Sequence, residues 1–540
     1  MANKVMKKKI FAFLPLFALL LSGCSLLEMG MGRNSSSGDS QTSSQVNSSS
    51  HYTSSGSTSS DSRSGTAKVE IYTTNDLHGQ VYDENYRCGI GRLGTFLKEK
   101  GAQSNTLLID QGDTWQGSIY SNYNHGALMT DIMNIVQYDA KCVGNHDFDW
   151  GIEPIINNNK MDWGGYRTPS LAGNVYSYDF QAKTEGNIQR SDIGVPSVKY
   201  TLENGLRVGI LGGIGSNQIT SINSQYTQDI CFKDHIAFIK SEATKLRKEG
   251  CDIVITSIHT GQESVMYQGL ENYVDLVLCG HTHQQEIAHE DSTFYVQNYG
   301  YGGSISKIDL KYSFDTHKLL STTINQYSGY DIINATPTVD AVIQHVIDIR
   351  YGSSCSQAAS EVLATNVTGE FSANGYAENL MATAVFNYVT SLGYDVCMSY
   401  VNDARHYLPA GTWTYADLYQ SFPFDNVVYI AEIKGYEVIN EIKNWNYIYR
   451  NSTFTTDTIY GNQTYTIAIL DYLYFHTNSN RYYDYFSYTG GTSTTTVPLN
   501  YREILRQFLI DGGYQSGNAL NPYEYSSSLW RHDRTAFTLA

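Results

Sequence analysis

The sequence predicts an α/β fold divided into two regions. The chain has 540 residues, which is too long for a single hydrophobic core. Between residues 68 and 320, short apolar runs typical of strands alternate with stretches whose apolar residues recur at helical spacing. A second pattern of this kind runs from about residue 366 to the C-terminus. We therefore expect two α/β domains, at residues 67–335 and 336–540.

The first domain is predicted to contain seven strands with helices between them. The helices are expected at residues 93–100, 128–136 and 236–248. The strand ranges are 69–73, 106–109, 140–143, 208–211, 253–257, 276–278 and 293–297. Five of these strands run directly into clusters of Asp, His or Asn. Because ligand groups gather at the carboxyl ends of strands in α/β sheets, we expect the five clusters to converge on one site.

The five polar clusters contain the ligand types of a divalent metal site. They offer carboxylate, imidazole and amide groups and no cysteine, a set suited to Zn, Mn, Fe or Mg rather than to a structural thiolate zinc. In Asp-x-His and His-x-His, residues i and i+2 of an extended segment point the same way, so each pair can face one site. The clusters are Asn-Asp-Leu-His-Gly at 75–79, Gly-Asp at 112–113, Gly-Asn-His-Asp-Phe-Asp at 144–149, His-Thr-Gly at 259–261 and Gly-His-Thr-His at 280–283.

These clusters resemble the five motifs of the calcineurin-like metallophosphatases, and residues 67–540 resemble the bacterial 5'-nucleotidase family. The resemblance implies an α/β/β/α sandwich with a two-metal site at the strand ends, followed by a smaller α/β domain that binds substrate. It implies two divalent ions, drawn from Mn, Zn, Mg, Fe or Co. One ion would be held by Asp76, His78, Asp113 and His283, and the other by Asp113, Asn145, His259 and His281, with Asp113 as the bridge.

The resemblance also implies the catalytic groups. Two ions about 3.5 to 4 Å apart polarise a phosphoryl group and acidify a water molecule, which becomes the nucleophile. His146 would stabilise the transferring phosphoryl group or the leaving oxygen. Asp149 would orient the imidazole of His146 and favour its charged form.

The second domain carries the candidate substrate-binding residues. By resemblance, Arg405 stands at the position of the family's substrate arginine, and Phe424 and Tyr472 are the two rings that would hold a nucleoside. Part of the family pattern is missing, because the Gly-Gly-Asp expected after the second ring reads Thr-Asn-Ser at 477–479. This difference from the family pattern affects the prediction of the substrate and does not affect the predicted metal ligands.

Several functions share this pattern. A nucleoside 5'-monophosphate is the leading substrate, and a 2',3'-cyclic nucleotide or a UDP-sugar is an alternative at the same site. A hydrolase of sulfur compounds or other non-nucleotides on the same scaffold is another alternative. A surface-binding lipoprotein that has lost catalysis is the alternative of another class.

The charge of the chain bears on its partners. A net charge of -17 argues against a nucleic-acid polymer as the main partner, because binding a phosphate backbone depends on Lys and Arg. A small anionic nucleotide is compatible with this charge, since metal ions supply local positive charge. We predict no obligate protein partner. The pattern gives no role for Cys88.

The N-terminus is predicted to direct the protein to the cell surface. Four lysines at positions 4 and 7–9 precede an apolar run at 10–21, which is typical of a signal peptide and shorter than the roughly 20 residues of a membrane span. Leu-Ser-Gly-Cys at 21–24 resembles the bacterial lipobox, which implies cleavage before Cys24 and its lipidation. Residues 25–66 are rich in Ser and poor in apolar residues, so we expect a flexible tether. The protein would be anchored to the outer face of the cytoplasmic membrane by its lipid.

Overall fold

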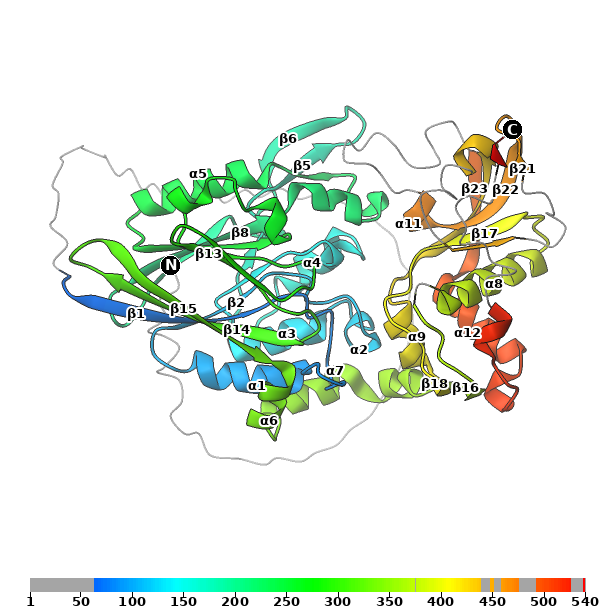
Figure 1. The fold of residues 1–540 in the computed structure, drawn as a ribbon, viewed down its shortest axis with the longest axis horizontal. Helices are drawn as coiled ribbons and strands as arrows, with labels where there is room; N and C mark the ends of the chain where they lie inside the picture. Colours follow the sequence, from blue (N-terminus) through cyan, green and yellow to red (C-terminus); the bar gives the residue numbers. More distant parts are fainter. Residues whose placement is uncertain are drawn as a thin grey trace, which may run out of the picture.

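Two α/β regions lie side by side in the computed structural model (Figure 1). The structure describes residues 63–373, 375–438, 447–450, 458–474, 492–525 and 538–539. The predicted signal peptide, Cys24 and the predicted tether up to residue 62 lie outside the described residues. We call the part built on the strands up to residue 328 the first region and the part built on the strands from residue 362 onward the second region.

The first region contains two six-stranded sheets. The first sheet has the order β15 (Lys318–Ser328), β14 (Ser304–Ser313), β1 (Thr66–Thr74), β2 (Thr106–Asp110), β3 (Ala140–Cys142) and β4 (Ser170–Leu171). The second has the order β12 (Glu286–Glu290), β13 (Thr293–Gln297), β11 (Leu276–Leu278), β10 (Ile253–His259), β8 (Arg207–Ile214) and β7 (Ser197–Thr201). The strands β1 to β4 run parallel, as do β8, β10, β11 and β13. Every strand predicted from the sequence overlaps one of these strands.

Three hydrophobic clusters separate the layers of the first region. Val69 and Ile71 of β1 point into a core between the two sheets, whereas Tyr72 points to the helices on the other face. That face is covered by α1 (Ile90–Gly101), α3 (Ala127–Val136) and α7 (Ala341–Ala359). The outer face of the second sheet is covered by α5 (His235–Lys248). The layers therefore follow the predicted α/β/β/α order, and the predicted fold class is confirmed.

Shorter elements complete the first region. A three-stranded sheet has the order β6 (Thr184–Gln189), β5 (Val175–Asp179) and β9 (Ile230–Phe232). The short helices are α2 (Ile119–Asn122), α4 (Ile152–Asn158) and α6 (Gly329–Ala335). The helix α7 links the two regions, because Ile343 and Val346 pack in the first region and Cys355 and Ala359 pack in the core of the second.

The second region is built on a five-stranded sheet. Its order is β20 (Tyr447–Arg450), β17 (Met398–Val401), β22 (Thr464–Leu470), β19 (Val427–Lys434) and β23 (Thr492–Asn500). Two strand pairs flank it, β16 (Val362–Val367) with β18 (Gly411–Thr414) and β21 (Thr458–Ile459) with β24 (Thr538–Leu539). The helices are α8 (Tyr376–Ser391), α9 (Tyr415–Ser421), α11 (Asp471–Tyr474) and α12 (Tyr501–Asp511).

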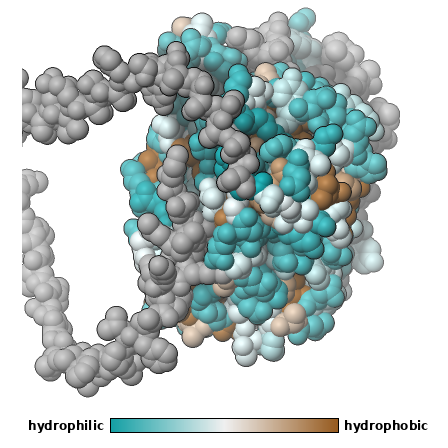
Figure 2. All heavy atoms as spheres, turned by 90° about the vertical axis from the view of Figure 1, so that its left-hand side faces the viewer, coloured by the Kyte–Doolittle hydropathy of each residue, from teal (hydrophilic) through white to brown (hydrophobic). Residues whose placement is uncertain are grey.

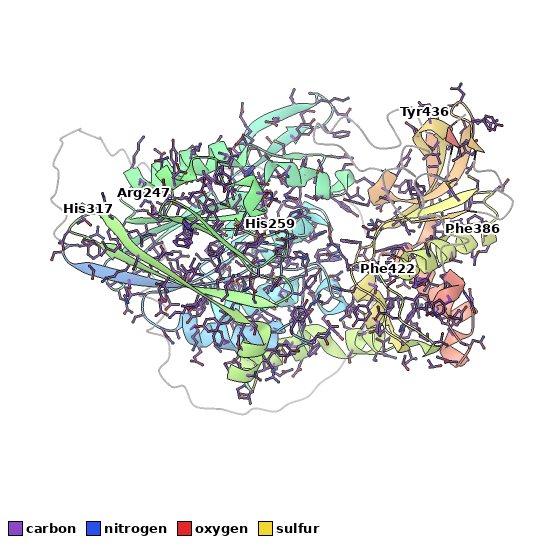
Figure 3. The ribbon with its side chains drawn as sticks, in the orientation of Figure 1. Arg247, His259, His317, Phe386, Phe422 and Tyr436 are labelled. Carbon is purple, nitrogen blue, oxygen red and sulfur yellow. The ribbon has the colours of Figure 1, made fainter. Side chains whose placement is uncertain are left out.

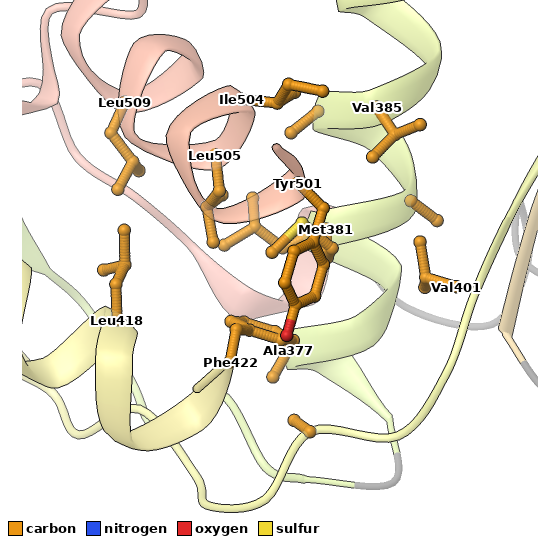
Figure 4. Packing of buried hydrophobic residues seen from close by; sticks show 14 of the residues in the cluster. Ala377, Met381, Val385, Val401, Leu418, Phe422, Tyr501, Ile504, Leu505 and Leu509 are labelled. Carbon is orange, nitrogen blue, oxygen red and sulfur yellow. The ribbon is translucent and has the colours of Figure 1, made fainter. Parts of the chain in front are cut away.

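Helices of the second region pack around one apolar core. Figure 4 shows Met381 and Val385 of α8 facing Ile504 and Leu505 of α12, with Phe422 from the end of α9 closing the cluster. All five side chains are buried. This packing supports the segments before and after α9, which carry two of the predicted substrate-binding residues.

The end of the first region that faces away from the second is mostly hydrophilic. Figure 2 shows this end, where the hydrophobic side chains are scattered among polar ones. Within the described ranges, no helix is both long and apolar enough to cross a membrane.

Candidate two-metal site

Five strand ends bring the predicted metal ligands together. The strands β1, β2, β3 and β11 each lead into a loop that carries one or two of these residues, and β10 ends on His259 itself. Figure 3 shows His259 in the interior of the first region. His78 and His259 are 3% and 0% exposed, while Asp113, Asn145, His281 and His283 line a cavity shared with the second region.

One group of ligand atoms comes from Asp76, His78 and His283. The Nε2 atoms of the two imidazoles lie 3.0 Å apart, and His283 Nε2 lies 3.3 Å from Asp76 Oδ1. His78 Nε2 lies 4.0 Å from the same carboxylate oxygen. Three lone-pair atoms from two loops thus face a common point.

A second group comes from Asp113, His259 and His281. Asn145 Oδ1 joins it, at 3.1 Å from His259 Nε2 and 3.0 Å from His281 Nδ1. Asp113 Oδ2 lies 3.2 Å from His259 Nε2 and 3.8 Å from His78 Nε2. This oxygen therefore lies between the two groups, which is the position of a bridging ligand.

The two groups fit divalent cations. Metal–ligand bonds of about 2.0 to 2.2 Å place neighbouring ligand atoms about 3.0 to 3.5 Å apart, which matches most of the distances between these atoms. Asp113 Oδ2 is buried and has no hydrogen-bond partner in the described structure, which would be costly without a cation. Imidazole, carboxylate and amide oxygen are ligands that Zn, Mn and related ions accept.

Backbone carbonyls orient two of the imidazoles. His78 Nδ1 lies 2.8 Å from the carbonyl of Gln116, and His259 Nδ1 lies 2.7 Å from the carbonyl of Gln111. A carbonyl only accepts, so each Nδ1 carries the proton and each Nε2 presents a lone pair to the ligand group.

The backbone is strained where these ligands lie. Five of the seven predicted ligands have positive φ angles, a conformation that costs a non-glycine residue about 1 to 3 kcal/mol. Gly144 adds a steric requirement, because a Cβ there would lie 2.0 Å from Asp113 Oδ1. Strain concentrated on ligands indicates that the loops are shaped for binding. The residues and φ angles are Asp76 (51°), His78 (46°), Asp113 (52°), His281 (79°) and His283 (57°).

Residues 69–285 match the sequence model of the calcineurin-like phosphoesterase family. These residues form a calcineurin-like phosphoesterase domain. The family uses two divalent metal ions, and both ligand groups lie within the matched residues. The prediction of two divalent cations is confirmed by the family and the two groups together.

Known proteins similar to this chain include nucleotidases. A 5'-nucleotidase of Mus musculus is 30% identical over 235 residues, which are 40% of this chain and 38% of that protein. The endonuclease YhcR of Bacillus subtilis is 24% identical over 411 residues, which are 69% of this chain and 32% of that protein. A 5'-nucleotidase precursor of Thermus thermophilus has the same fold, with a TM-score of 0.68 at 16% identity over 84% of this chain and 97% of that chain. The match with each of the two sequence relatives covers less than half the length of that relative.

A row of three side chains links the phosphoesterase domain to the second region. Asp149 Oδ2 lies 2.8 Å from His146 Nδ1, and Arg405 Nη2 lies 2.7 Å from His146 Nε2. Arg405 can only donate, so Nε2 accepts and the ring proton is on Nδ1, where it is donated to Asp149. The predicted orienting contact of Asp149 is thus present.

The predicted charged form of His146 is not what this structure favours. Burial, which is the largest cause, and the Arg405 cation lower the pKa of His146 to about 3 against the opposing effect of Asp113. The expectation considered the carboxylate partner and neither the burial of the ring nor the arginine on its other nitrogen, and the catalytic role of His146 stays a prediction.

A cavity of about 460 Å³ joins the phosphoesterase domain to the second region. His283 and Asn145 line it on the metal side, and Arg405, Phe424 and Tyr472 line it on the other. The ring of Phe424 lies 5.4 Å from that of His146, and the Arg405 guanidinium lies 5.1 Å from the centre of the Phe424 ring. All three predicted substrate-binding residues therefore face one space with the predicted catalytic residues.

Two buried residues outside the predicted ligand and catalytic set support the loops of the site. Buried Asp147 accepts a hydrogen bond from the Gly144 amide at 3.0 Å and lies 3.4 Å from Lys141 Nζ, so it holds the loop that carries Asn145 and His146. Cys88 is buried, and its amide donates to the Gly302 carbonyl at 3.0 Å. Asp147 belongs to the Gly-Asn-His-Asp cluster at 144–147, whereas no motif marks Cys88.

Proposed function

We propose that this protein is a metal-dependent phosphoesterase that hydrolyses nucleoside 5'-monophosphates. The proposal rests on the cavity, in which the two ligand groups, His146, an arginine and two aromatic rings face one another. Two cations held by the ligand groups would polarise a phosphate and acidify a water molecule, while the rings offer a surface for a base. The similarity to 5'-nucleotidases supports the same reaction.

Arg405 and His146 have complementary roles in this proposal. A guanidinium can donate two parallel hydrogen bonds to a phosphate, which binds Arg405 more strongly than the neutral imidazole does. When Arg405 moves to the phosphate, His146 Nε2 loses its 2.7 Å contact and becomes available to the substrate. Asp149 keeps the ring oriented through Nδ1.

The experiment that tests the function is phosphate release by protein lacking residues 1–24, with and without Mn²⁺ or Zn²⁺. The panel contains AMP, UMP, 2',3'-cyclic AMP, a UDP-sugar and an aryl phosphate. Metal-dependent release from AMP, faster than from the other members, supports the proposal. Faster turnover of the cyclic nucleotide or UDP-sugar would assign one of those substrates instead, and metal binding without turnover would indicate a binding lipoprotein.

Single-stranded DNA and RNA complete the panel. A relative named as an endonuclease aligns with 69% of this chain, so a polymer substrate is a direct competitor of the mononucleotide. The net charge of -17 leads us to expect no cleavage of either polymer.

Replacing Phe424 by Leu is expected to weaken nucleotide binding. Stacking of a base on an aromatic ring contributes about 1 to 3 kcal/mol, so KM for AMP should rise at least about fivefold. KM for glycerol phosphate, which has no base, should not change. Tyr436→Leu is the matched control, because this 40% exposed ring of the second region does not line the cavity. An equal rise of KM for both substrates would show that Phe424 does not bind the base.

We further propose that the protein is anchored to the outer face of the cytoplasmic membrane through a lipid on Cys24. In a bacterial host, the wild-type chain should enter the membrane fraction and Cys24→Ser should be released from it. Retention of both chains would indicate an uncleaved membrane-spanning segment at residues 10–21 instead.

A further inference from the structure

Tyr301 touches every member of one of the two ligand groups. Its ring stacks on that of His78, with centroids 4.9 Å apart and planes at 28°. The same ring meets the edge of His283, with centroids 5.2 Å apart and planes at 88°. Its backbone amide donates to the carbonyl of Asp76 at 2.6 Å. A single residue thus contacts Asp76, His78 and His283, which lie on two different loops.

The backbone around Tyr301 is constrained. Tyr301 follows β13 and has a φ angle of 58°, a strained conformation for an aromatic residue. A Cβ on the preceding Gly300 would lie 3.1 Å from His283 Cγ and 3.3 Å from Asp76 Cβ. A Cβ on the following Gly302 would lie 2.2 Å from the Cys88 carbonyl oxygen. Residues 300–302 therefore pack closely against the ligands and Cys88, and little space is left for a side chain at either glycine.

Other side chains hold the Tyr301 ring in place. The Arg87 guanidinium lies 4.4 Å from the centre of the ring, which is within the range of a cation–π interaction. His406 of the second region meets the ring at 5.3 Å and lies 3.3 Å from Arg87 Nη1. Both regions thus fix the ring that contacts the two imidazoles.

In the part of the chain that the structure describes, the predicted metal ligands in ring contact with Tyr301 belong to one ligand group, that of Asp76, His78 and His283. Among the described residues, the rings in contact with Tyr301 are those of His78, His283 and His406. In the other group, the carbonyl of Gln111 orients His259, and Asn145 Oδ1 lies beside His281 Nδ1 as a fellow ligand atom. A change at Tyr301 should therefore affect the two cation sites unequally.

We propose that Tyr301 is a positioning residue that sets the two imidazoles of the Asp76, His78 and His283 site and thereby its affinity for a cation. The ring fixes the angle between the imidazoles, and the amide fixes the loop of Asp76 relative to them. Groups that orient metal ligands without binding the metal typically change affinity about 10- to 100-fold when removed.

The test is a titration of metal-free protein with Mn²⁺, followed by calorimetry and by electron paramagnetic resonance. Wild-type protein should bind two ions and give the spectrum of a coupled pair. Tyr301→Ala should bind one ion with unchanged affinity and the second at least about tenfold more weakly, so that one equivalent gives the six-line spectrum of an isolated ion. Binding of two ions with wild-type affinities, or equal weakening of both sites, would overturn the proposal.

Three matched variants separate positioning from general stability. Tyr301→Phe keeps the ring and should bind both ions as the wild type does. Tyr299→Ala removes a half-exposed ring two residues away on the same segment and should also leave both sites unchanged. Tyr301→Leu keeps apolar bulk without the ring, so it provides the same comparison if Tyr301→Ala does not fold. The titration uses no nucleotide, so its result is independent of the proposed substrate.

Discussion

Replacing Asp113 by Asn is expected to abolish the coupled pair of cations and to lower kcat/KM for AMP by at least about a thousandfold. The reason is the position of Oδ2, which lies within 3.2 Å of His259 Nε2 and 3.8 Å of His78 Nε2 and so faces both sites. Asn puts an N–H donor or a neutral oxygen there in place of a shared negative charge. A thousandfold loss corresponds to about 4 kcal/mol of transition-state stabilisation, which is in the range of an electrophilic metal centre.

Asn is the informative substitution because it preserves shape. Asp113 Oδ1 accepts the backbone amide of His146 at 2.8 Å, and an Asn oxygen can accept the same bond. Metal content and activity should therefore fall while the thermal unfolding temperature of the metal-free protein changes little.

Asp110→Asn is the matched control for this variant. Asp110 is also buried at the end of β2, but its carboxylate accepts from Thr74, Thr114 and the Gly112 amide and belongs to neither ligand group. Burial raises its pKa to about 7, so a neutral side chain is tolerated there. Two tightly bound ions and more than a tenth of the activity in Asp113→Asn would contradict the bridging role.

The ligand loops could be predicted because they follow from local patterns. Each strand before a ligand is a short apolar run, and parallel strands bring their carboxyl ends to the same edge of a sheet. The strands β14 and β15 were not among the predicted strands. On β15, most side chains are exposed or half-buried, so polar residues such as Asn325 and Gln326 interrupt the apolar pattern that marks a strand.

The surroundings of the ligands depend on tertiary contacts that no local pattern describes. Tyr301 lies near His78 in space but 223 positions away in the chain, and nothing in its own segment marks it as part of a metal site. His406 reaches that ring only because the second region packs against the phosphoesterase domain. The contact of Arg405 with His146 likewise joins residues 259 positions apart. Resemblance to a family nominated both residues of this pair, while their contact depends on how the regions pack.

The second large effect is expected for His146→Gln, which should lower kcat for AMP by about a hundred- to ten-thousandfold. The variant should retain both cations. The bond that His146 gives to the metal centre comes from its backbone amide, which donates to Asp113 Oδ1 and is unchanged by the substitution. A fall in kcat with both ions bound would show that His146 acts in catalysis without holding a cation, unlike the seven predicted ligands.

The size of the loss should depend on the leaving group. If His146 acts on the leaving oxygen, 4-nitrophenyl phosphate, whose leaving group needs no protonation, should lose much less activity than AMP. If His146 acts on the transferring phosphoryl group, both substrates should lose activity equally. Asp149 and His146 both line the cavity, and His146 Nε2 lies beside Arg405, so a leaving oxygen that enters from the second region would approach this nitrogen. Protonation of that oxygen requires a proton on Nε2, which can bind there once Arg405 has moved to the phosphate. We therefore expect the unequal result, and an equal loss would assign His146 to the phosphoryl group.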